Sequence, residues 1–314
     1  IWDTVVEDVI GDKDPKNVKG IKVKIPNGVS VRDDGSIDYP SNYVFNGTLG
    51  SAQWTTDPAW CLYDLLTSQR YGCGDFISAS QLDVYNFYAA SVYSSELVTF
   101  KDRLGTGVVT TITEPRFSLN VNIQTRQDVF KTVNSLCSVF RAMPLYVSGS
   151  ISLIQDKAGI DPSFLFTTAN VTPEGFNYTG SSLKQRHSVV SVSYFNMDSR
   201  EIDFEVYGDG NTTAEVNRRN KFGIVYKQVK SFGCTSRGQA QRLARAIVFS
   251  EEQESEVINF STSMDAGAIV RPGSVIAVND PVRQGDRRSG RIAAATTTQI
   301  TVDDTANLDS FGGS

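Results

Sequence analysis

The stretch DPAWCLYDLLTSQRYGCGDFI, from Asp57 to Ile77, contains the clearest folding signals in this chain. Asp57 followed by Pro58 is typical of a helix start, because an Asp side chain caps free backbone N–H groups and proline is tolerated at the first helical position. The predicted helix has one apolar face, formed by Cys61, Leu62, Leu65 and Leu66. The first half of the stretch therefore predicts an ordinary capped, amphipathic helix.

The second half of the stretch predicts a tight turn. Cys73 lies between Gly72 and Gly74, and we expect both glycines to adopt positive φ there. Cys61 and Cys73 have no short Cys-x-x-Cys spacing and no histidine near them, so neither is expected to bind a metal. We interpret the stretch as architecture: a capped helix with a core thiol, followed by a turn.

Further helices and one strand are predicted up to Met143. Ser78–Gln81 has a capping-box pattern and predicts a helix start. The inward residues of that helix would be Leu82, Tyr85, Tyr88, Ala89 and Val92. Alternation of apolar and polar residues predicts a strand at Arg116–Ile123. A third helix is predicted from about Gln127, with an apolar stripe of Val129, Val133, Leu136, Cys137 and Phe140.

Beyond Met143 the pattern becomes mainly β. A hairpin is predicted around Ser148 and Gly149, and strands are predicted in HSVVSVSYF and SEVINFSTSM. One helix interrupts them from near Ser236, with Ala240, Leu243, Ala244, Ile247 and Val248 inward. The last stretch resembles a small barrel or sandwich of short strands. The expected class is therefore mixed β with an α+β portion.

The totals describe a globular chain of 314 residues with 40% hydrophobic and 21% charged residues. The net charge of −5 argues against a dedicated nucleic-acid binder. The four cysteines are far apart, so we expect reduced, buried thiols and no disulfide framework. The chain begins at Ile1 instead of Met, and we expect it to be part of a longer protein.

No catalytic, cofactor-binding or metal-binding residues are predicted. The single histidine, His187, starts an alternating strand and is interpreted as an ordinary hydrogen-bonding residue. No Walker loop, G-x-S-x-G elbow or H-E-x-x-H motif is present. Asp33, Asp34 and Asp38 do not match the spacing of an EF-hand and favour turn chemistry. A carboxylate pair for glycoside hydrolysis leaves no spacing signature and carries little weight here.

Two charged clusters have open interpretations. The basic residues Arg283, Arg287, Arg288 and Arg291 suit either a phosphate site or a solvated hairpin tip, and Asp286 within the cluster favours the tip. The acidic run Glu251–Glu256 is interpreted as a solvated surface or an interface.

Several long segments resemble one family in the same order. They are VKGIKVKIP (Val18–Pro26), the opening stretch, and the segments Glu114–Met143, Phe166–Asn196 and Phe232–Ile292. Together they resemble the tail-tip host-specificity protein J family of lambda-like siphophages. Asp57 stands where that family usually has Asn, and Cys61 and Cys73 replace other residues.

The resemblance implies a structural tail hub, not an enzyme. Such hubs are homotrimers that close the distal end of the tail tube and form part of the host-attachment and DNA-ejection apparatus. They are built from several small β-barrel or sandwich domains with a helix-containing inserted domain, as in phage baseplate hubs. The chain would be made in the host cytoplasm and located in the virion, at the tail tip.

The expected domains are 1–50 (a β-rich hub segment, completed by strands after 161), 51–160 (α+β), 161–260 (β-rich hub domain with a helix at about 236–251) and 261–314 (a truncated, small β-barrel-like domain). The implied partners are the distal tail protein, other tail-tip proteins and the tape-measure protein. Phage DNA would pass through the lumen without specific binding, and a host receptor would bind C-terminal parts beyond this chain. We hypothesise that part of the acidic excess, either Glu251–Glu256 or the N-terminal acids, faces that lumen, because an acidic wall repels DNA.

Two other functions are weighed against the hub. One is a tail-associated cell-wall or polysaccharide hydrolase, which would need a cleft of carboxylates or a metal. The other is a receptor-binding adhesin that uses Trp60 and the tyrosines between Leu82 and Tyr93. Aromatic residues at helical spacing are more often core than binding surface, so the hub is favoured.

Overall fold

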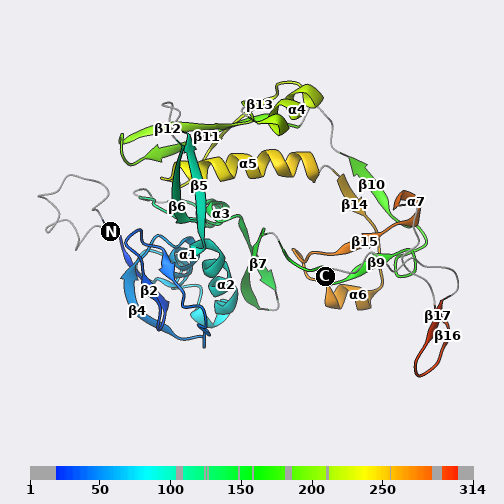
Figure 1. The fold of residues 1–314 in the computed structure, drawn as a ribbon. Coiled ribbons are helices and arrows are strands. Elements are labelled where there is room, and N and C mark those ends of the chain that lie inside the picture. Colours follow the sequence, from blue (N-terminus) through cyan, green and yellow to red (C-terminus); the bar gives the residue numbers. More distant parts are fainter. Residues whose placement is uncertain are drawn as a thin grey trace, which may run out of the picture. The chain divides into compact units, whose positions relative to one another are not determined.

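The computed structural model describes residues 19–103, 109–123, 125, 127–147, 149–157, 159–180, 186–209, 212–254, 256–284 and 292–302. The chain forms two compact units (Figure 1). Unit one comprises Ile1–Asp156 and Leu183–Glu252, and unit two comprises Lys157–Ser182 and Gln253–Ser314. Both units are therefore discontinuous in sequence. The domain boundaries expected from the sequence stay a prediction.

The opening stretch forms the centre of the first hydrophobic core in unit one. Helix α1 (Pro58–Thr67) begins where it was predicted, and the Asp57 side chain accepts a hydrogen bond from the Trp60 backbone N–H at 2.9 Å. Its fully buried residues include Trp60 and Leu62, while Cys61 is half-buried against the same core. The predicted cap and the core role of Cys61 are confirmed.

The expectation about the two turn glycines is wrong, although the turn itself is present. Neither Gly72 nor Gly74 has positive φ. A Cβ at Gly72 would overlap the carbonyl oxygen of Leu65 and lie 2.8 Å from its carbon, and one at Gly74 would lie 2.7 Å from the backbone nitrogen of Gln69. The glycines are needed because the turn folds back against the last turn of α1, where Cys73 N–H donates to the Leu65 carbonyl.

The second predicted helix is present but begins later and uses another face. Ser78–Gln81 does form a capping box, yet it starts only the short 3₁₀ helix η2 (Ala79–Gln81). Helix α2 (Val84–Ser95) has Asp83 as its own cap. It buries Phe87, Ala90, Ser91, Ser94 and Ser95, whereas Tyr85 and Val92 are exposed.

The buried serines of α2 explain the change of face. Ser91 and Ser95 both donate to the buried Oδ2 atom of Asp57, at 2.7 and 3.1 Å. The Ser91 hydroxyl also lies 2.7 Å from the Tyr39 hydroxyl, which accepts from Nε1 of Trp60 at 3.1 Å. Burial raises the pKa of Asp57, despite the hydrogen bonds from Trp60 and the two serines that oppose this shift. A polar network therefore ties α1 to α2.

The third helix matches its prediction more closely. Helix α3 (Val129–Val139) is capped by Asp128 and buries Val133, Leu136 and Cys137, while Val129 is exposed. The hairpin β7 (Ala142–Val147) and β8 (Ser150–Gln155) follows, and Gly149 in its turn has φ 82°. Ser148 lies outside the described residues. The hairpin prediction is confirmed.

The predicted strand at Arg116–Ile123 is wrong. The strands before it are the antiparallel pair β5 (Leu97–Arg103) and β6 (Val109–Pro115), and the segment after β6 belongs to no strand. Its backbone instead makes individual hydrogen bonds to distant segments of unit one. Leu119 N–H donates to the Thr56 carbonyl, and Asn120 N–H donates to the Gly233 carbonyl. Phe117 and Leu119 pack against the first core while Asn120 and Asn122 are exposed, so the alternation reflects one-sided packing without a partner strand.

Two further pairs complete this half of unit one. Strand β1 (Lys22–Pro26) pairs antiparallel with β4 (Leu49–Trp54), and β2 (Ser30–Val31) pairs with β3 (Ile37–Asp38). Val23 and Ile25 of β1 point into the core on one side, as their alternation predicts.

The remainder of unit one is a three-stranded sheet with helix α5 (Arg237–Gln253) packed on one face (Figure 1). The sheet order is β12 (Glu201–Tyr207), β11 (Val189–Asn196), β13 (Tyr226–Lys230), antiparallel and then parallel. The core between sheet and helix joins Val190, Val192 and Tyr194 to Ala240, Ala244 and Val248. The predicted strand and helix are both confirmed, and helix α4 (Thr213–Phe222) was not predicted.

Unit two consists of short elements. Strand β9 (Leu165–Thr167) pairs parallel with β15 (Ala277–Asn279), β10 (Asn177–Gly180) pairs with β14 (Glu256–Asn259), and β16 (Ile292–Ala295) pairs with β17 (Ile300–Val302). Helices α6 (Met264–Ile269) and α7 (Pro281–Gln284) are short. The mixed class is confirmed, and no sheet of the described residues closes into a barrel. Among the helices described, none has the length and apolar character needed to cross a membrane.

Candidate functional site

The four thiols do not form a reactive site. All four are free; Cys73, Cys137 and Cys234 are buried and Cys61 is half-buried. Burial raises the pKa of every one of them, to about 12 for Cys137 and about 11 for Cys234. A thiol reacts as its thiolate, so none of these groups is an activated nucleophile at neutral pH.

His187 takes part in a structural ion-pair group. Its Nδ1 atom and its backbone nitrogen both lie 2.8 Å from Oε2 of Glu251, whose Oε1 atom accepts from Lys227 Nζ at 2.9 Å. Burial alone would raise the pKa of Glu251, but the hydrogen bonds from Lys227 and His187 outweigh it and the pKa is lowered. The group joins the end of α5 to the starts of β11 and β13.

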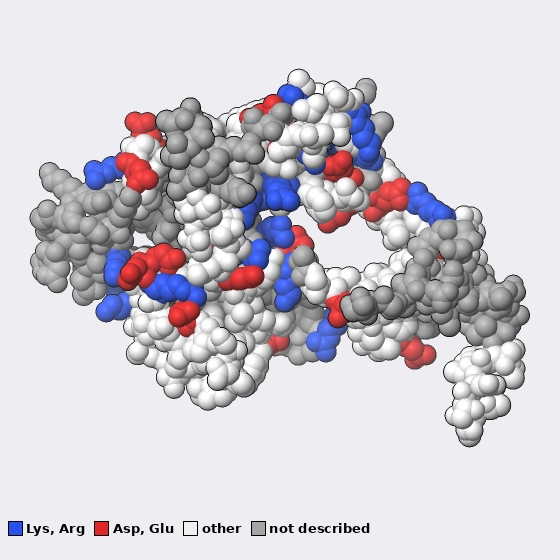
Figure 2. Space-filling model, viewed as in Figure 1, with Lys and Arg blue, Asp and Glu red and all other residues white. Residues whose placement is uncertain are grey.

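Two further glutamates of the acidic run, Glu252 and Glu256, also have cationic partners. Within unit one, Glu252 accepts from Nε of Arg218 at 2.8 Å. Within unit two, Glu256 and Arg283 form a two-bond pair at 2.6 and 2.7 Å. Three of the four glutamates in the run are thus paired with cations, which weakens the hypothesis that the run repels DNA. Figure 2 accordingly shows acidic and basic side chains interleaved over the described part of the face drawn.

Only Arg283 of the basic cluster lies in the described part of the chain, and the acidic turn is held by its own hydrogen bonds and an ion pair. Arg283 is paired as above, and Arg287, Arg288 and Arg291 lie outside the described residues. Asp34 accepts from the backbone and hydroxyl of Ser36, and Asp38 pairs with Arg32 at 2.5 Å, as turn chemistry predicts. No group of three or more His, Cys, Asp or Glu side chains in the described ranges is arranged to hold a metal ion.

Trp60, a candidate for an adhesive surface, is enclosed in the core. Its ring packs edge-on against Phe45 and Tyr63, with centroids 6.1 and 5.6 Å away. Tyr88 on α2 stacks on Phe45 at 4.9 Å. Trp60 is therefore unavailable to a receptor, whereas Tyr88 is only partly buried and Tyr85 is exposed.

An unpredicted feature is the apolar outer face of the three-stranded sheet. Strand β12 turns Glu205 toward α5, where it is 6% exposed and pairs with Arg237 at 2.7 Å. The alternate residues Ile202 and Phe204 therefore face away from the helix, 61% and 50% exposed. Register places Phe195 of β11 opposite Ile202, and it too is exposed. The sequence pattern of β12 alone would have put these apolar residues inward.

We define the outer sheet face as Phe195, Ile202, Phe204, Val206 and Tyr226. In a half-buried strand the apolar side normally faces the core, so this arrangement is unusual for a surface exposed to water. Contiguous exposed apolar groups of this kind mark protein–protein contact sites. The outer sheet face is the candidate assembly surface of unit one.

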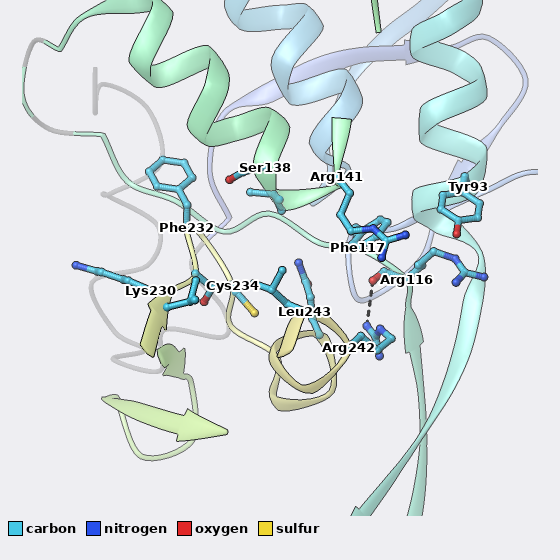
Figure 3. Close-up of a pocket in the computed structure, with 14 residues that line it drawn as sticks. Tyr93, Arg116, Phe117, Ser138, Arg141, Lys230, Phe232, Cys234, Arg242 and Leu243 are labelled. Carbon is cyan, nitrogen blue, oxygen red and sulfur yellow. Dashed lines mark hydrogen bonds between the residues drawn. The ribbon is translucent and has the colours of Figure 1, made fainter. Parts of the chain in front are cut away.

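A second unpredicted feature is a pocket of about 200 Å³ in unit one (Figure 3). It lies where the C-terminal end of α3, the segment after β6, the loop after β13 and helix α5 meet. Its walls include the aromatic residues Tyr93, Phe117 and Phe232 and the polar residues Ser138, Ser231 and Gln239. Among the described residues that line it, none is acidic and four are basic: Arg116, Arg141, Lys230 and Arg242.

Long-range contacts bring the pocket residues together. Gln239 of α5 accepts from the Ser118 backbone and hydroxyl at 3.1 and 3.0 Å. Arg242, on the next turn of the same helix, donates to the Arg116 carbonyl at 3.0 Å and pairs with Glu114 at 2.6 Å. Residues more than a hundred positions apart thus meet, and no sequence signal could have indicated this pocket.

The comparisons with known proteins place the chain in a class. A family model described as a putative phage tail protein matches residues 131–295, more than half of the chain. The chain belongs to this family of phage tail proteins.

Within that class the similarity is to named tail-tip proteins. The chain is 32% identical over 292 residues to tip attachment protein J of Escherichia phage SECphi27, which covers 89% of this chain and 23% of the relative. It is 28% identical over 276 residues to tip attachment protein J of Escherichia phage SECphi4, covering 87% of this chain and 22% of the relative. The resemblance seen in the sequence is confirmed, and the chain spans less than a quarter of the length of these relatives.

Among solved structures, the chain is similar to a tail protein from Neisseria meningitidis MC58. The TM-score is 0.38 at 13% identity, over 53% of this chain and 50% of that one. A likeness of this degree carries no argument about fold.

Proposed function

We propose that the chain is part of a structural tail-tip hub of a non-contractile-tailed phage. In this role it closes the distal end of the tail tube as a homotrimer and forms part of the host-attachment and DNA-ejection apparatus. The observation that carries the proposal is the continuous similarity, over 89% of the chain, to a protein named for tip attachment. A match of that extent concerns whole units of structure and not a single shared motif.

The structure of unit one supports a role in assembly. The outer sheet face offers apolar side chains that a monomer gains nothing by exposing, and contact with a neighbouring tail subunit would bury them. Among the described strands β12 also lies at the edge of its sheet, and an edge strand can pair with another chain. We propose that this face contacts another copy of the hub or an adjoining tail protein.

The proposed partners follow from a position at the end of the tube. They are the distal tail protein, other tail-tip proteins and the tape-measure protein, with DNA passing through the lumen without specific binding. A host receptor would be bound by parts of the full protein beyond this chain. The role is non-enzymatic, in keeping with raised thiol pKa values and with a histidine engaged by Glu251.

The test is a cryo-electron microscopy map of the tail tip of the phage that encodes this chain. Unit one should fit density at the distal end of the tube in three symmetry-related copies. Density for the chain elsewhere in the particle, or one copy per tail, would overturn the proposal. Release of soluble fragments from purified murein by the isolated chain would instead favour a cell-wall hydrolase.

A further inference from the structure

The three-stranded sheet of unit one has two edges of different chemistry. Among the described strands, β12 ends the sheet on one side of β11 and β13 ends it on the other. The outward backbone groups of an edge strand can pair with a strand of another chain. We propose that β12 of one copy of this chain pairs antiparallel with β13 of the next copy. This inference rests on the proposed homotrimer.

Hydrogen bonds to β11 identify the outward backbone groups of β13. The Val225 carbonyl accepts from Val189 N–H, and Ser231 N–H donates to the Ser193 carbonyl. Backbone groups of successive residues in a strand point to opposite sides, so the odd-numbered positions of β13 bond to β11. The even-numbered positions therefore direct their N–H and carbonyl groups to the outer edge. They are Tyr226, Gln228 and Lys230.

The same reasoning identifies the outward positions of β12. Phe195 N–H donates to the Cys234 carbonyl, beyond β13, so Phe195 and the opposite residue Ile202 exchange no hydrogen bonds. The outward positions of β12 are therefore Ile202, Phe204 and Val206. In agreement, Phe204 N–H donates to the side chain of its neighbour Asp203, at 2.8 Å. A partner strand would offer that N–H a backbone carbonyl.

The outward positions of both strands also carry the outer sheet face. Ile202, Phe204 and Val206 belong to it from β12, and Tyr226 belongs to it from β13. Antiparallel pairing sets outward positions opposite one another, so it joins the outer sheet faces of two copies into one surface. Phe204 and Tyr226, 50% and 56% exposed, then become cross-strand neighbours. Aromatic neighbours of this kind stabilise a strand pair.

The charges of the two edges favour pairing between unlike edges. The seven residues of β12 include the acids Glu201, Asp203 and Glu205 and no base, whereas the five of β13 include Lys227 and Lys230 and no acid. Two copies of β12, or two of β13, would therefore bring like charges together, which destabilises a pair. Pairing of β12 with β13 instead places Lys227, 39% exposed, opposite an acid of β12. That acid is Asp203 in one register and Glu205 in the next.

A contact between unlike edges runs head to tail from copy to copy. Such a contact forms a ring when its rotation closes and a filament when it does not. In the proposed homotrimer the ring closes after three copies. The partner of each edge is thus a second copy of this chain. The pairing is short, with five residues in β13, so it fixes register and direction within a larger interface.

The experiment is cysteine cross-linking in tails purified from phage that carry the variant chain. Two double variants cover the two registers: Phe204→Cys with Tyr226→Cys, and Phe204→Cys with Gln228→Cys. Opposed residues of a hydrogen-bonded antiparallel pair have Cα atoms about 5.5 Å apart, which a disulfide spans. After mild oxidation, we expect one of the two double variants to move from the monomer band to bands of two and three linked copies on a non-reducing gel.

Two matched controls should stay in the monomer band. Phe204→Cys alone should not cross-link, because a contact between unlike edges does not bring two copies of this position together. Phe204→Cys with Phe76→Cys combines the same edge position with a site of unit one that is 88% exposed and outside the sheet. The native thiols are buried or half-buried and their pKa values are raised, so they react slowly in all variants.

Two results would overturn the inference. One is a chain that is present in the tails but stays monomeric in both double variants. The other is linked dimers from Phe204→Cys alone, which indicate pairing between like edges. Absence of the original chain from purified tails would instead overturn the proposed tail-tip role. If tails with Phe204→Cys do not form, Ile202→Cys combined with Gln228→Cys or with Lys230→Cys tests the same two registers.

Discussion

Asp57 is the residue whose replacement tests the folding argument most sharply. Its carboxyl accepts from the Trp60 N–H and from the hydroxyls of Ser91 and Ser95, which are 0% and 4% exposed. In Asp57→Ala the helix loses its cap, which costs about 1 kcal/mol. The two buried hydroxyls lose their acceptor, at about 1–3 kcal/mol each. Ser91 can turn toward Tyr39, which leaves the cap and the Ser95 hydroxyl, so we expect a total of about 2–4 kcal/mol.

Asp57→Asn should behave differently, because the amide keeps one oxygen for the Trp60 N–H and the serine hydroxyls can rotate to accept from its NH₂ group. Asn is also the residue that the protein J family resemblance gives at this place. We expect the free energy of unfolding of Asp57→Asn to lie within about 1 kcal/mol of the original chain at acid pH.

The pH dependence of the unfolding free energy distinguishes the original chain from Asp57→Asn. The pKa of Asp57 is raised in the folded state, so its carboxyl contributes stability below the unfolded pKa, and this contribution is lost as pH rises through the folded pKa. The amide introduced by Asp57→Asn would not titrate. The free energy of unfolding of the original chain should therefore fall relative to that of Asp57→Asn as pH rises. The expected loss is about 1.4 kcal/mol for each unit by which folding raises the pKa of Asp57.

The assay is urea unfolding followed by tryptophan fluorescence at several pH values from 4 to 8, for which the buried Trp60 is a local reporter. Parallel stability curves for the original chain and Asp57→Asn across this range would refute the assignment of a raised pKa. An Asp57→Ala protein as stable as Asp57→Asn would refute the account of the serine network.

Three further predictions concern the turn, the outer sheet face and the thiols. Gly72→Ala should destabilise unit one by about 1–3 kcal/mol or more in urea unfolding, because its Cβ meets rigid backbone, whereas Gly20→Ala, which meets nothing within 4 Å, should change little; equal effects would contradict the close-approach argument. Phe204→Lys introduced into the phage should lower the yield of complete tails seen by electron microscopy, and Phe76→Lys, at an exposed site away from the outer sheet face, should not; normal tails with Phe204→Lys would argue against an assembly surface there. The four cysteines should react with a thiol reagent roughly tenfold more slowly, or slower still, in the folded than in the unfolded chain, and one fast thiol in the folded chain would indicate an activated site.

The parts that could be predicted from the sequence rest on local chemistry. Asp57 caps a helix within three residues of itself, and Gly149 makes a short hairpin turn, so both features depend on neighbouring residues. The inward face of α5 follows from helical periodicity alone. Each such element was located correctly because its determinants lie within one or two turns of the chain.

The errors arise where distant residues decide the outcome. The buried face of α2 was misjudged because Ser91 is buried by its bond to Asp57, 34 positions away. The segment after β6 alternates like a strand, but Leu119 bonds to Thr56 instead of a neighbouring strand. The outer sheet face is exposed because Glu205 pairs with α5 and takes the inner side. No local pattern contains these contacts.

The most direct measurement is a cryo-electron microscopy map of the intact tail tip at a resolution that shows side chains. We expect unit one in three symmetry-related copies at the distal end of the tail tube, with Ile202 and Phe204 buried against a neighbouring subunit. A map with this chain outside the tail tip, or with the outer sheet face open to solvent in every copy, would contradict the account.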